Sequence, residues 1–401
     1  MKPLALQSLD IAEYRGLGGM KLEQFGRINL FVGGNNSGKT SVLEALALFA
    51  RPLDIDNWVN TAWRREIKGS RIPVAETIKW MFPRRAGEPE DSGRIWVQGT
   101  GSFPGRRLLA EYHEERVVPG VWQEPVKGSY DYDNGQAHGV QSNSGTIASS
   151  GSRGPAGGEP IGRALELDLL ADFVRRLPSG QEMGDNQNRV SVRISEDDSL
   201  TYSGRAQEPL VPLAVVDASA HRVEATVQDL YSAALRAEKA NQDLKSDFVR
   251  VLQKIDPGVQ RLDLVQAGRV ATRLQIKHEK TGVTPLSALG DGFRRALMIA
   301  VTIPTVRGGI LLIDELETAL HASVLDSVLG LLKWAAEEFE VQVFATTHSL
   351  EAVDAVLATL PNAKDELVGY HLAIEGELRQ AKRYTADLWE RLRFERGLDI
   401  R

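Results

Sequence analysis

Cysteine is missing from the 401-residue sequence, so disulfides, zinc–thiolate sites and thiol catalysis are excluded. Long apolar runs are missing too: no uninterrupted stretch approaches the length needed to cross a bilayer. The N-terminus also lacks a basic segment followed by an apolar one, which a signal peptide would have. We therefore expect a cytoplasmic protein that makes no contact with a membrane.

A large excess of acidic or basic residues is also missing: 54 acidic residues face 48 basic ones, and the net charge is −6. That balance argues against wholesale coating of nucleic acid but leaves a local basic patch open. No heptad pattern is sustained over four or more repeats, so a long coiled-coil arm is not expected. Hydrophobic residues make up 42% and charged residues 25%, as in soluble globular proteins, and the chain is long enough to bury a full core.

The stretch 33–40 reads GGNNSGKT and fits the phosphate-binding pattern GxxxxGK[ST]. An apolar run, 28–32, precedes it and predicts a buried strand, while 41–49 carries apolar residues at helical spacing. Glycines let backbone N–H groups close around a phosphate, and the helix N-terminus adds partial positive charge. In such a loop the lysine reaches the β- and γ-phosphates and the threonine offers its hydroxyl to Mg²⁺. The expected nucleotide ligands are Gly33, Asn35, Asn36, Ser37, Gly38, Lys39, Thr40 and Ser41.

Two further apolar strands end in polar groups. The run 309–313 leads into Asp314 and Glu315, and the run 341–345 leads into a segment that contains His348. Parallel strands deliver their C-terminal residues to one sheet edge, where the phosphate loop also opens. Asp314 can then hold Mg²⁺ with Thr40, and Glu315 can polarise the attacking water. His348 can contact the γ-phosphate. The alternative is a solvated acidic turn and a loop histidine.

Small residues, Gly290, Asp291 and Gly292, precede a second apolar helix. This is a second potential phosphate cradle, with an ordinary helix cap as the alternative. Two cradles in one chain make most sense if each active site is assembled from two subunits. We therefore expect a homo-oligomer, a dimer of heads or larger.

The segments between these motifs suggest a division into four parts. We expect 1–60 to form the N-terminal part of an ATPase core and 61–222 a β-rich part with an exposed insertion at about 128–162. Residues 223–283 should form a helical lobe with return strands, and 284–401 the C-terminal part of the core. The stretch 61–85 is basic with interleaved tryptophans; it is either a nucleic-acid contact or a solvated face.

The order of these motifs resembles the ATP-binding-cassette (ABC) ATPase heads of the SMC, RecF and OLD families, over about 1–50 and 284–355. The resemblance implies an α/β head with a mixed β-sheet core, an antiparallel β subdomain and a short helical lobe. It also implies ATP and Mg²⁺ as ligands, Arg15 as a nucleotide contact, Glu315, His348 and Lys39 as catalytic residues, and 317–321 as a subunit-contacting D-loop. Gly290–Gly292 falls where the family signature usually has Ser-Gly-Gly, with Ser287 three positions early; Gln98 is one of several candidates for the Q-loop glutamine.

OLD nucleases carry a Toprim domain after the head, whereas about fifty residues follow His348 in this sequence. The sequence thus resembles the stand-alone ATPase subunits of anti-phage defence systems, AriA of PARIS or PtuA of Septu. That resemblance implies a separate effector such as a Toprim or HNH nuclease. The alternatives are a RecF-like repair ATPase that clamps DNA and a nucleotide-gated scaffold with negligible hydrolysis.

Overall fold

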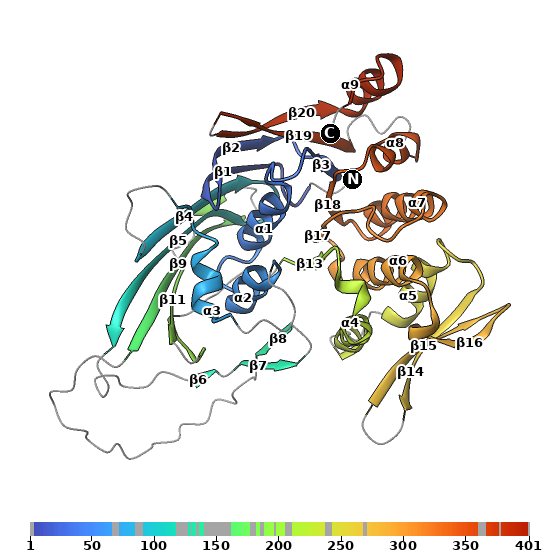
Figure 1. The fold of residues 1–401 in the computed structure, drawn as a ribbon, viewed down its shortest axis with the longest axis horizontal. Helices are drawn as coiled ribbons and strands as arrows, with labels where there is room; N and C mark the ends of the chain where they lie inside the picture. Colours follow the sequence, from blue (N-terminus) through green and yellow to red (C-terminus); the bar gives the residue numbers. More distant parts are fainter. Residues whose placement is uncertain are drawn as a thin grey trace.

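The computed structural model describes most of the chain. The described residues are 4–65, 72–84, 91–117, 127–128, 130–133, 136–139, 162–176, 182–184, 188–195, 198–204, 211–236, 243–267, 271–359, 366–376 and 378–399. Within them the chain forms two large sheets, with helices between the sheets and on the outer side of one of them (Figure 1).

The central sheet has six strands and brings the two ends of the sequence together. Its order is β13 (Leu213–Val216), β17 (Ile310–Ile313), β18 (Gln342–Thr347), β3 (Ile28–Val32), β19 (Leu367–Glu375) and β20 (Leu378–Thr385). All neighbours are parallel except β19 and β20, so the sheet is mixed as expected. Every residue of β3, β17 and β18 is buried, which explains the continuous apolar sequence of β17 and the apolar residues that dominate β3.

Alternate residues of the central strands face two different cores. Leu311 and Ile313 pack into the core under α6 (Asp291–Thr302), α7 (Ala322–Glu338) and α8 (Leu350–Thr359). Ile310 and Leu312 pack into the core that holds α1 (Lys39–Ala50). The sheet therefore has helices on both faces, and its carboxyl edge stays free for the polar residues that follow each strand.

A nine-stranded antiparallel sheet covers the other side of α1, α2 (Ile55–Trp63) and α3 (Val74–Lys79) (Figure 1). Its order is β2 (Leu17–Glu23), β1 (Ser8–Tyr14), β4 (Ser92–Thr100), β5 (Gly105–Val117), β9 (Gly162–Arg176), β11 (Asn188–Ser195), β12 (Leu200–Gly204) and β6 (Lys127–Gly128), with β10 (Glu182–Gly184) beside β9. This sheet is the expected antiparallel subdomain. Its inner face carries Leu108, Ala110, Leu167 and Leu169, while charged residues alternate with them on the outer face.

A small lobe follows β13. It contains α4 (Glu224–Arg236), α5 (Leu244–Leu252) and the antiparallel strands β14 (Val259–Ala267), β15 (Ala271–His278) and β16 (Gly282–Pro285). The longest helix within the described ranges is α7 with 17 residues, so the expected absence of a long coiled coil is confirmed there. None of the helices in those ranges is long and apolar enough to cross a membrane. The C-terminal part ends in α9 (Ala386–Glu390) and a π-helical turn, Arg391–Glu395.

Two features of the fold bear on the division of the chain that the sequence suggests. The expected exposed insertion at 128–162 contains a short hairpin, β7 (Tyr130–Asp133) and β8 (Gln136–Gly139), where alternating Tyr and Asp favour strands; residues 140–161 lie outside the described residues. The sheets also cross the suggested division, since β1 and β4 pair across it and β13 joins the central sheet. Both pairings join residues too distant for local sequence to indicate.

Candidate functional site: a phosphate loop beside paired carboxylates

The phosphate loop connects β3 to α1 at the carboxyl edge of the central sheet. Gly38 has φ 101° and immediately precedes the first turn of α1, and Gly33 has φ 152°. A Cβ atom at Gly33 would lie 2.4 Å from the carbonyl oxygen of Leu372, and one at Gly38 would lie 2.7 Å from Leu17 Cδ2. Only glycine fits these two positions. The N-terminus of the 12-residue helix α1 therefore opens toward the cavity described below.

Lys39 folds back onto the loop that precedes it. Its Nζ donates to the carbonyl oxygens of Gly33 at 2.7 Å and Gly34 at 2.9 Å. Burial lowers the pKa of Lys39, and the nearby carboxylates of Asp314, Glu317 and Glu315 oppose that shift. The buried hydroxyl of Ser37 has no hydrogen-bond partner among the described residues. An ammonium group held in the loop and an unused buried hydroxyl both fit an incoming phosphate group.

Thr40 and Asp314 lie together at the edge of the sheet although 274 positions separate them. The Thr40 hydroxyl is 3.2 Å from Oδ1 of Asp314 and 3.4 Å from Oδ2. Thr346, at the end of β18, donates a second hydrogen bond of 2.7 Å to Oδ1. Hydroxyl and carboxylate oxygens are the ligands that Mg²⁺ prefers, so this donor set fits the ion expected with a nucleotide triphosphate.

Glu315 has a left-handed backbone, with φ 48°. Its N–H donates to Oγ1 of Thr346 at 2.8 Å, and its Oε2 accepts from the hydroxyl of Thr318 at 2.9 Å. Such strained backbone persists only where surrounding contacts enforce it, and it is common at functional sites. These contacts fix the direction of the carboxylate at the cavity wall.

Arg295 ties the second glycine-rich helix to this strained turn. Its side chain is fully buried, and its Nη2 donates to the carbonyl oxygens of Asp314 at 2.7 Å and Glu315 at 3.3 Å. Nη1 donates to the carbonyl oxygen of Asp217, which follows β13. Burial lowers the pKa of Arg295 to about 10, although nearby carboxylates oppose the shift. The start of α6 and the backbone of the paired carboxylates therefore form one rigid unit.

His348 follows β18 and is 51% exposed. Its backbone N–H donates to Oε1 of Glu317 at 3.0 Å, and its Nδ1 lies 3.1 Å from the same oxygen. The histidine is therefore positioned by the segment 317–321 that the resemblance assigns to the D-loop.

One open cavity of about 640 Å³ collects most of the expected site residues, a size ordinary for small-molecule sites. Those that line it are Arg15, Asn35, Asn36, Gly38, Lys39, Thr40, Ser41, Asp314, Glu315 and His348. Gly33 and Ser37 lie within the same loop but are not part of the lining. Gly290, Asp291 and Gly292 stand apart from it, at the start of α6 beside Ala319.

Several lining residues were not expected from the sequence. They are Gly16, Arg65, Trp80, Phe82, Arg84, Thr346 and Arg379. Four of them, Arg65, Trp80, Phe82 and Arg84, belong to the basic, tryptophan-containing stretch 61–85, so that pattern was a usable signal for this part of the cavity wall. Arg379, in β20, donates to the carbonyl oxygen of Gly16 at 2.6 Å, and no local pattern marks it.

Arg15 joins the first hairpin to α1 through a buried acid. Its Nε donates to Oε2 of Glu44 at 2.8 Å, and the Glu44 side chain is fully buried. Arg65 and Tyr14 bind the same carboxylate, from 2.7 Å and 3.0 Å. Burial works against the charge of Arg15, but Tyr14 and Glu44 outweigh it and raise the pKa of Arg15. Arg15 therefore remains charged at the cavity wall.

The other two basic residues of the stretch 61–85 that the structure describes, Arg64 and Lys79, are paired with carboxylates. Arg64 lies 2.7 Å from Asp217, and Lys79 contacts Glu76 at 2.7 Å and also Glu114. Residues 66–71 and 85 lie outside the described residues. Gln98, the candidate for the Q-loop, donates to Asp10 at 3.1 Å on the exposed sheet and is not part of the cavity lining.

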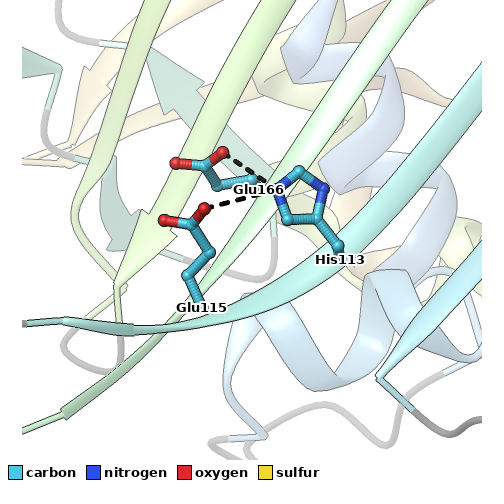
Figure 2. A group of neighbouring side chains, drawn as sticks. All are labelled: His113, Glu115 and Glu166. Atoms are coloured by element: carbon cyan, nitrogen blue, oxygen red, sulfur yellow. Dashed lines mark ion pairs between the residues drawn. The ribbon is translucent and has the colours of Figure 1, made fainter.

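A second cluster of charged groups lies on the outer face of the antiparallel sheet (Figure 2). Nε2 of His113 is 3.1 Å from Glu166 and 3.6 Å from Glu115, and ligand atoms of all three lie within 4.8 Å of one another. Arg193 sits 3.7 Å from Glu115 and already supplies positive charge. The group is therefore explained as an exposed cross-strand ion-pair network.

A protein-family model described as "AAA domain, putative AbiEii toxin, Type IV TA system" matches residues 187–354. The sequence is 28% identical over 362 residues to a Helicobacter pylori protein named ATP/GTP phosphatase, covering 87% of this chain and 86% of that protein. It is 42% identical over 69 residues to an uncharacterized protein of Methanocaldococcus jannaschii, covering 17% of this chain and 60% of that protein. A second uncharacterized protein of that organism is 48% identical over 44 residues, and the chain spans 20% of its length.

Among solved structures, an SMC head bound to the C-terminal winged-helix domain of ScpA is similar, with a TM-score of 0.45 and 12% identity over 98% of this chain and 99% of that one. The SMC head domain of Thermotoga maritima has a TM-score of 0.41 and 11% identity over 95% of this chain and 99% of that one. The matched family model, the phosphate loop between β3 and α1, and the paired carboxylates after β17 together support a P-loop ATPase head.

Proposed function

We propose that the protein binds and hydrolyses ATP between two copies of its head and uses that nucleotide-dependent assembly to control a separate effector. The observation that carries the proposal is the separation of two glycine-rich helix starts. The phosphate loop lines the cavity, whereas Gly290–Gly292 does not. A second subunit can supply the missing wall.

In this proposal each residue has a defined task. Lys39 and the N–H groups of the loop bind the β- and γ-phosphates, and the Glu315 carboxylate accepts a proton from the attacking water. The bond between the γ-phosphorus and the bridging oxygen then breaks, and ADP and phosphate leave. Mg²⁺, held by Thr40 and Asp314, would neutralise phosphate charge. His348 would contact the γ-phosphate.

Gly290 offers a sharp test of assembly. A Cβ atom there meets nothing within 4 Å, and its backbone, with φ −66° and ψ 158°, suits any residue. Gly290→Glu should therefore fold normally and still bind ATP, but its carboxylate would repel a nucleotide held by the partner. The matched control is Gly330→Glu, on α7, where a Cβ also meets nothing within 4 Å.

The measurement is light scattering with and without ATP in a Glu315→Gln background, which should trap the assembled state. We expect dimers with ATP in that background and in Gly330→Glu, but monomers in Gly290→Glu and in Lys39→Ala. If Gly290→Glu still forms dimers with ATP, the active site is not assembled from the two glycine-rich helix starts of different subunits. ATP hydrolysis by Glu315→Gln at the parental rate would remove Glu315 as the base.

We further propose that the effector acts in antiviral defence. Its support is the motif resemblance to AriA and PtuA and a family description that mentions a toxin–antitoxin system. Co-purification with a Toprim or HNH nuclease encoded beside the gene, with and without ATP, tests it. If Lys39→Ala releases the nuclease and the parent retains it, the nucleotide controls the effector. If the nuclease forms no complex with the parent or the variant, with or without ATP, the proposal is contradicted.

DNA clamping of the RecF type has less support, because Arg64 and Lys79 are paired with carboxylates. It predicts that DNA stimulates hydrolysis at low salt and that added salt weakens the effect steeply. A flat response of phosphate release to duplex DNA would remove this alternative.

A further inference from the structure

Trp80 is a large aromatic side chain that remains 52% exposed at the wall of the phosphate-loop cavity. It directly follows α3, and its backbone N–H closes that helix by donating to Glu76 at 3.2 Å. Leaving so much indole in water is unfavourable. The exposed part of Trp80 can therefore gain burial from a ligand that enters the cavity.

The position of the indole is tied to the phosphate loop through Arg15. Nη1 of Arg15 donates to the Trp80 carbonyl oxygen at 3.0 Å, and its backbone N–H donates to Met81 at 3.0 Å. The same guanidinium binds buried Glu44, which lies on α1 directly behind the loop. The tryptophan is thus fixed relative to the helix N-terminus that would hold phosphate.

Charge and shape around Trp80 suit a flat, electron-rich group. The guanidinium carbon of Arg84 lies 3.9 Å from the indole centroid, and Phe82 also lines the cavity. Phe82 is held in place by an edge-to-face contact with Tyr112, with centroids 4.6 Å apart. Arginine guanidinium planes and aromatic rings are both surfaces on which nucleobases stack.

We infer that Trp80 and Arg84 form the stacking platform for the base of the nucleotide whose phosphates occupy the loop. This inference rests on the proposed function and adds a preference for the base of the nucleotide. The lining residues that follow Trp80 closely in the sequence, Phe82 and Arg84, offer an aromatic ring and a guanidinium group. Affinity should therefore depend on the stacking area of the base more than on the hydrogen-bonding groups at its edge. Purines should bind better than pyrimidines, with little discrimination between adenine and guanine.

The experiment compares four ligands with three variants. Binding of ATP, GTP, UTP and inorganic tripolyphosphate is measured by calorimetry for the parent, Trp80→Ala, Trp80→Phe and the control Trp334→Phe. Trp334 lies in the other core, against Phe339. We expect Trp80→Ala to weaken ATP and GTP about tenfold, equivalent to about 1.4 kcal/mol, while tripolyphosphate binds as before. Trp80→Phe should retain most of the affinity, and Trp334→Phe all of it.

A second readout does not depend on affinity. Stacking quenches indole emission, so ATP but not tripolyphosphate should quench the parent and Trp334→Phe, and the quench should disappear in Trp80→Phe. The inference is overturned if the ratio of ATP to tripolyphosphate affinity is unchanged in Trp80→Ala, or if the ATP quench survives in Trp80→Phe. Failure of the proposed function looks different: Lys39→Ala would then leave the affinities for ATP and tripolyphosphate unchanged.

Discussion

The hydroxyl of Thr318 donates a 2.9 Å hydrogen bond to Oε2 of Glu315, so a residue of the turn after β17 aims the proposed general base. Thr318→Val removes this donor while keeping the volume. We expect kcat for ATP to fall about tenfold, a fraction of the about 10²–10⁴-fold that a general base contributes. Thr318→Ser, which keeps the hydroxyl, should retain the parental rate. A Thr318→Val variant with parental kcat would show that the contact does not position the base.

Asp314 and the Thr40 hydroxyl, 3.2 Å apart, would hold the metal. Chelation of Mg²⁺ with EDTA should stop phosphate release, and Asp314→Asn should raise the Mg²⁺ concentration needed for half-maximal rate at least about tenfold, because it removes the charged ligand. Asp168→Asn is the control, since that carboxylate pairs with Arg189 on the antiparallel sheet. Equal Mg²⁺ requirements for all three proteins would contradict the assignment.

Glu44 is a buried carboxylate that serves two arginines, Arg15 and Arg65. Glu44→Ala leaves both without their counter-charge and should lower the free energy of unfolding by about 3 kcal/mol. The comparison is Glu13→Ala. Glu13 pairs with Arg94 at 2.9 Å, and the Arg94 side chain is half exposed. Loss of this pair should lower the free energy of unfolding by less than about 1 kcal/mol. Urea unfolding measures both. Equal losses would mean that burial of the pair is not what stabilises it.

Two glycines make a matched test of packing. A Cβ at Gly369, in β19, would lie 2.2 Å from the buried ring of Trp389, so Gly369→Ala should destabilise by about 1–3 kcal/mol through overpacking. At Gly330, inside α7, a Cβ meets nothing, and Gly330→Ala should stabilise by about 0.5–1 kcal/mol. Thermal unfolding should therefore shift in opposite directions. Shifts of the same sign would contradict the packing of Trp389 on β19.

His221 is fully buried beside the guanidinium of Arg295. Burial first, and then Arg295, lower the pKa of His221 below its usual 6.5. As pH falls below about 6.5 the unfolded chain takes up a proton that the native state refuses, so the free energy of unfolding decreases; above that pH this contribution is constant. Thermal unfolding from pH 8 to 5.5 should show a shallower decline for His221→Gln than for the parent. Identical slopes would contradict a depressed pKa.

The sequence predicts those parts of the site in which a short contiguous segment indicates both its secondary structure and its chemistry. Residues 28–40 combine an apolar strand with a glycine loop, and 310–315 an apolar strand with two carboxylates, so their meeting at one sheet edge follows from parallel pairing. The mixed sheet, the antiparallel subdomain and the short lobe were expected from the resemblance to known ATPase heads, which the order of these motifs carries.

The rest depends on contacts between distant segments. Arg379 reaches the cavity from β20, and β13 enters the central sheet beside β17 although about ninety residues separate the two strands. Glu44 looks like a surface charge on a helix because nothing near it in the sequence reveals the two arginines that bury it. Trp80 and Arg84 were recognised as a basic aromatic pattern, but only the fold brings them to the phosphate loop.

The strand that leads into the phosphate loop has both of its neighbours near the other end of the chain. β3 pairs with β18 and β19, so residues 28–32 cannot form their ladders until 343–347 and 367–371 have been synthesised. Closing loops of this length is slow relative to local helix formation. During synthesis, the loop that holds phosphate must emerge from the ribosome long before the strands that shape it. Nucleotide binding therefore becomes available only after residue 371 has been synthesised, and a product that terminates before that residue should not bind ATP.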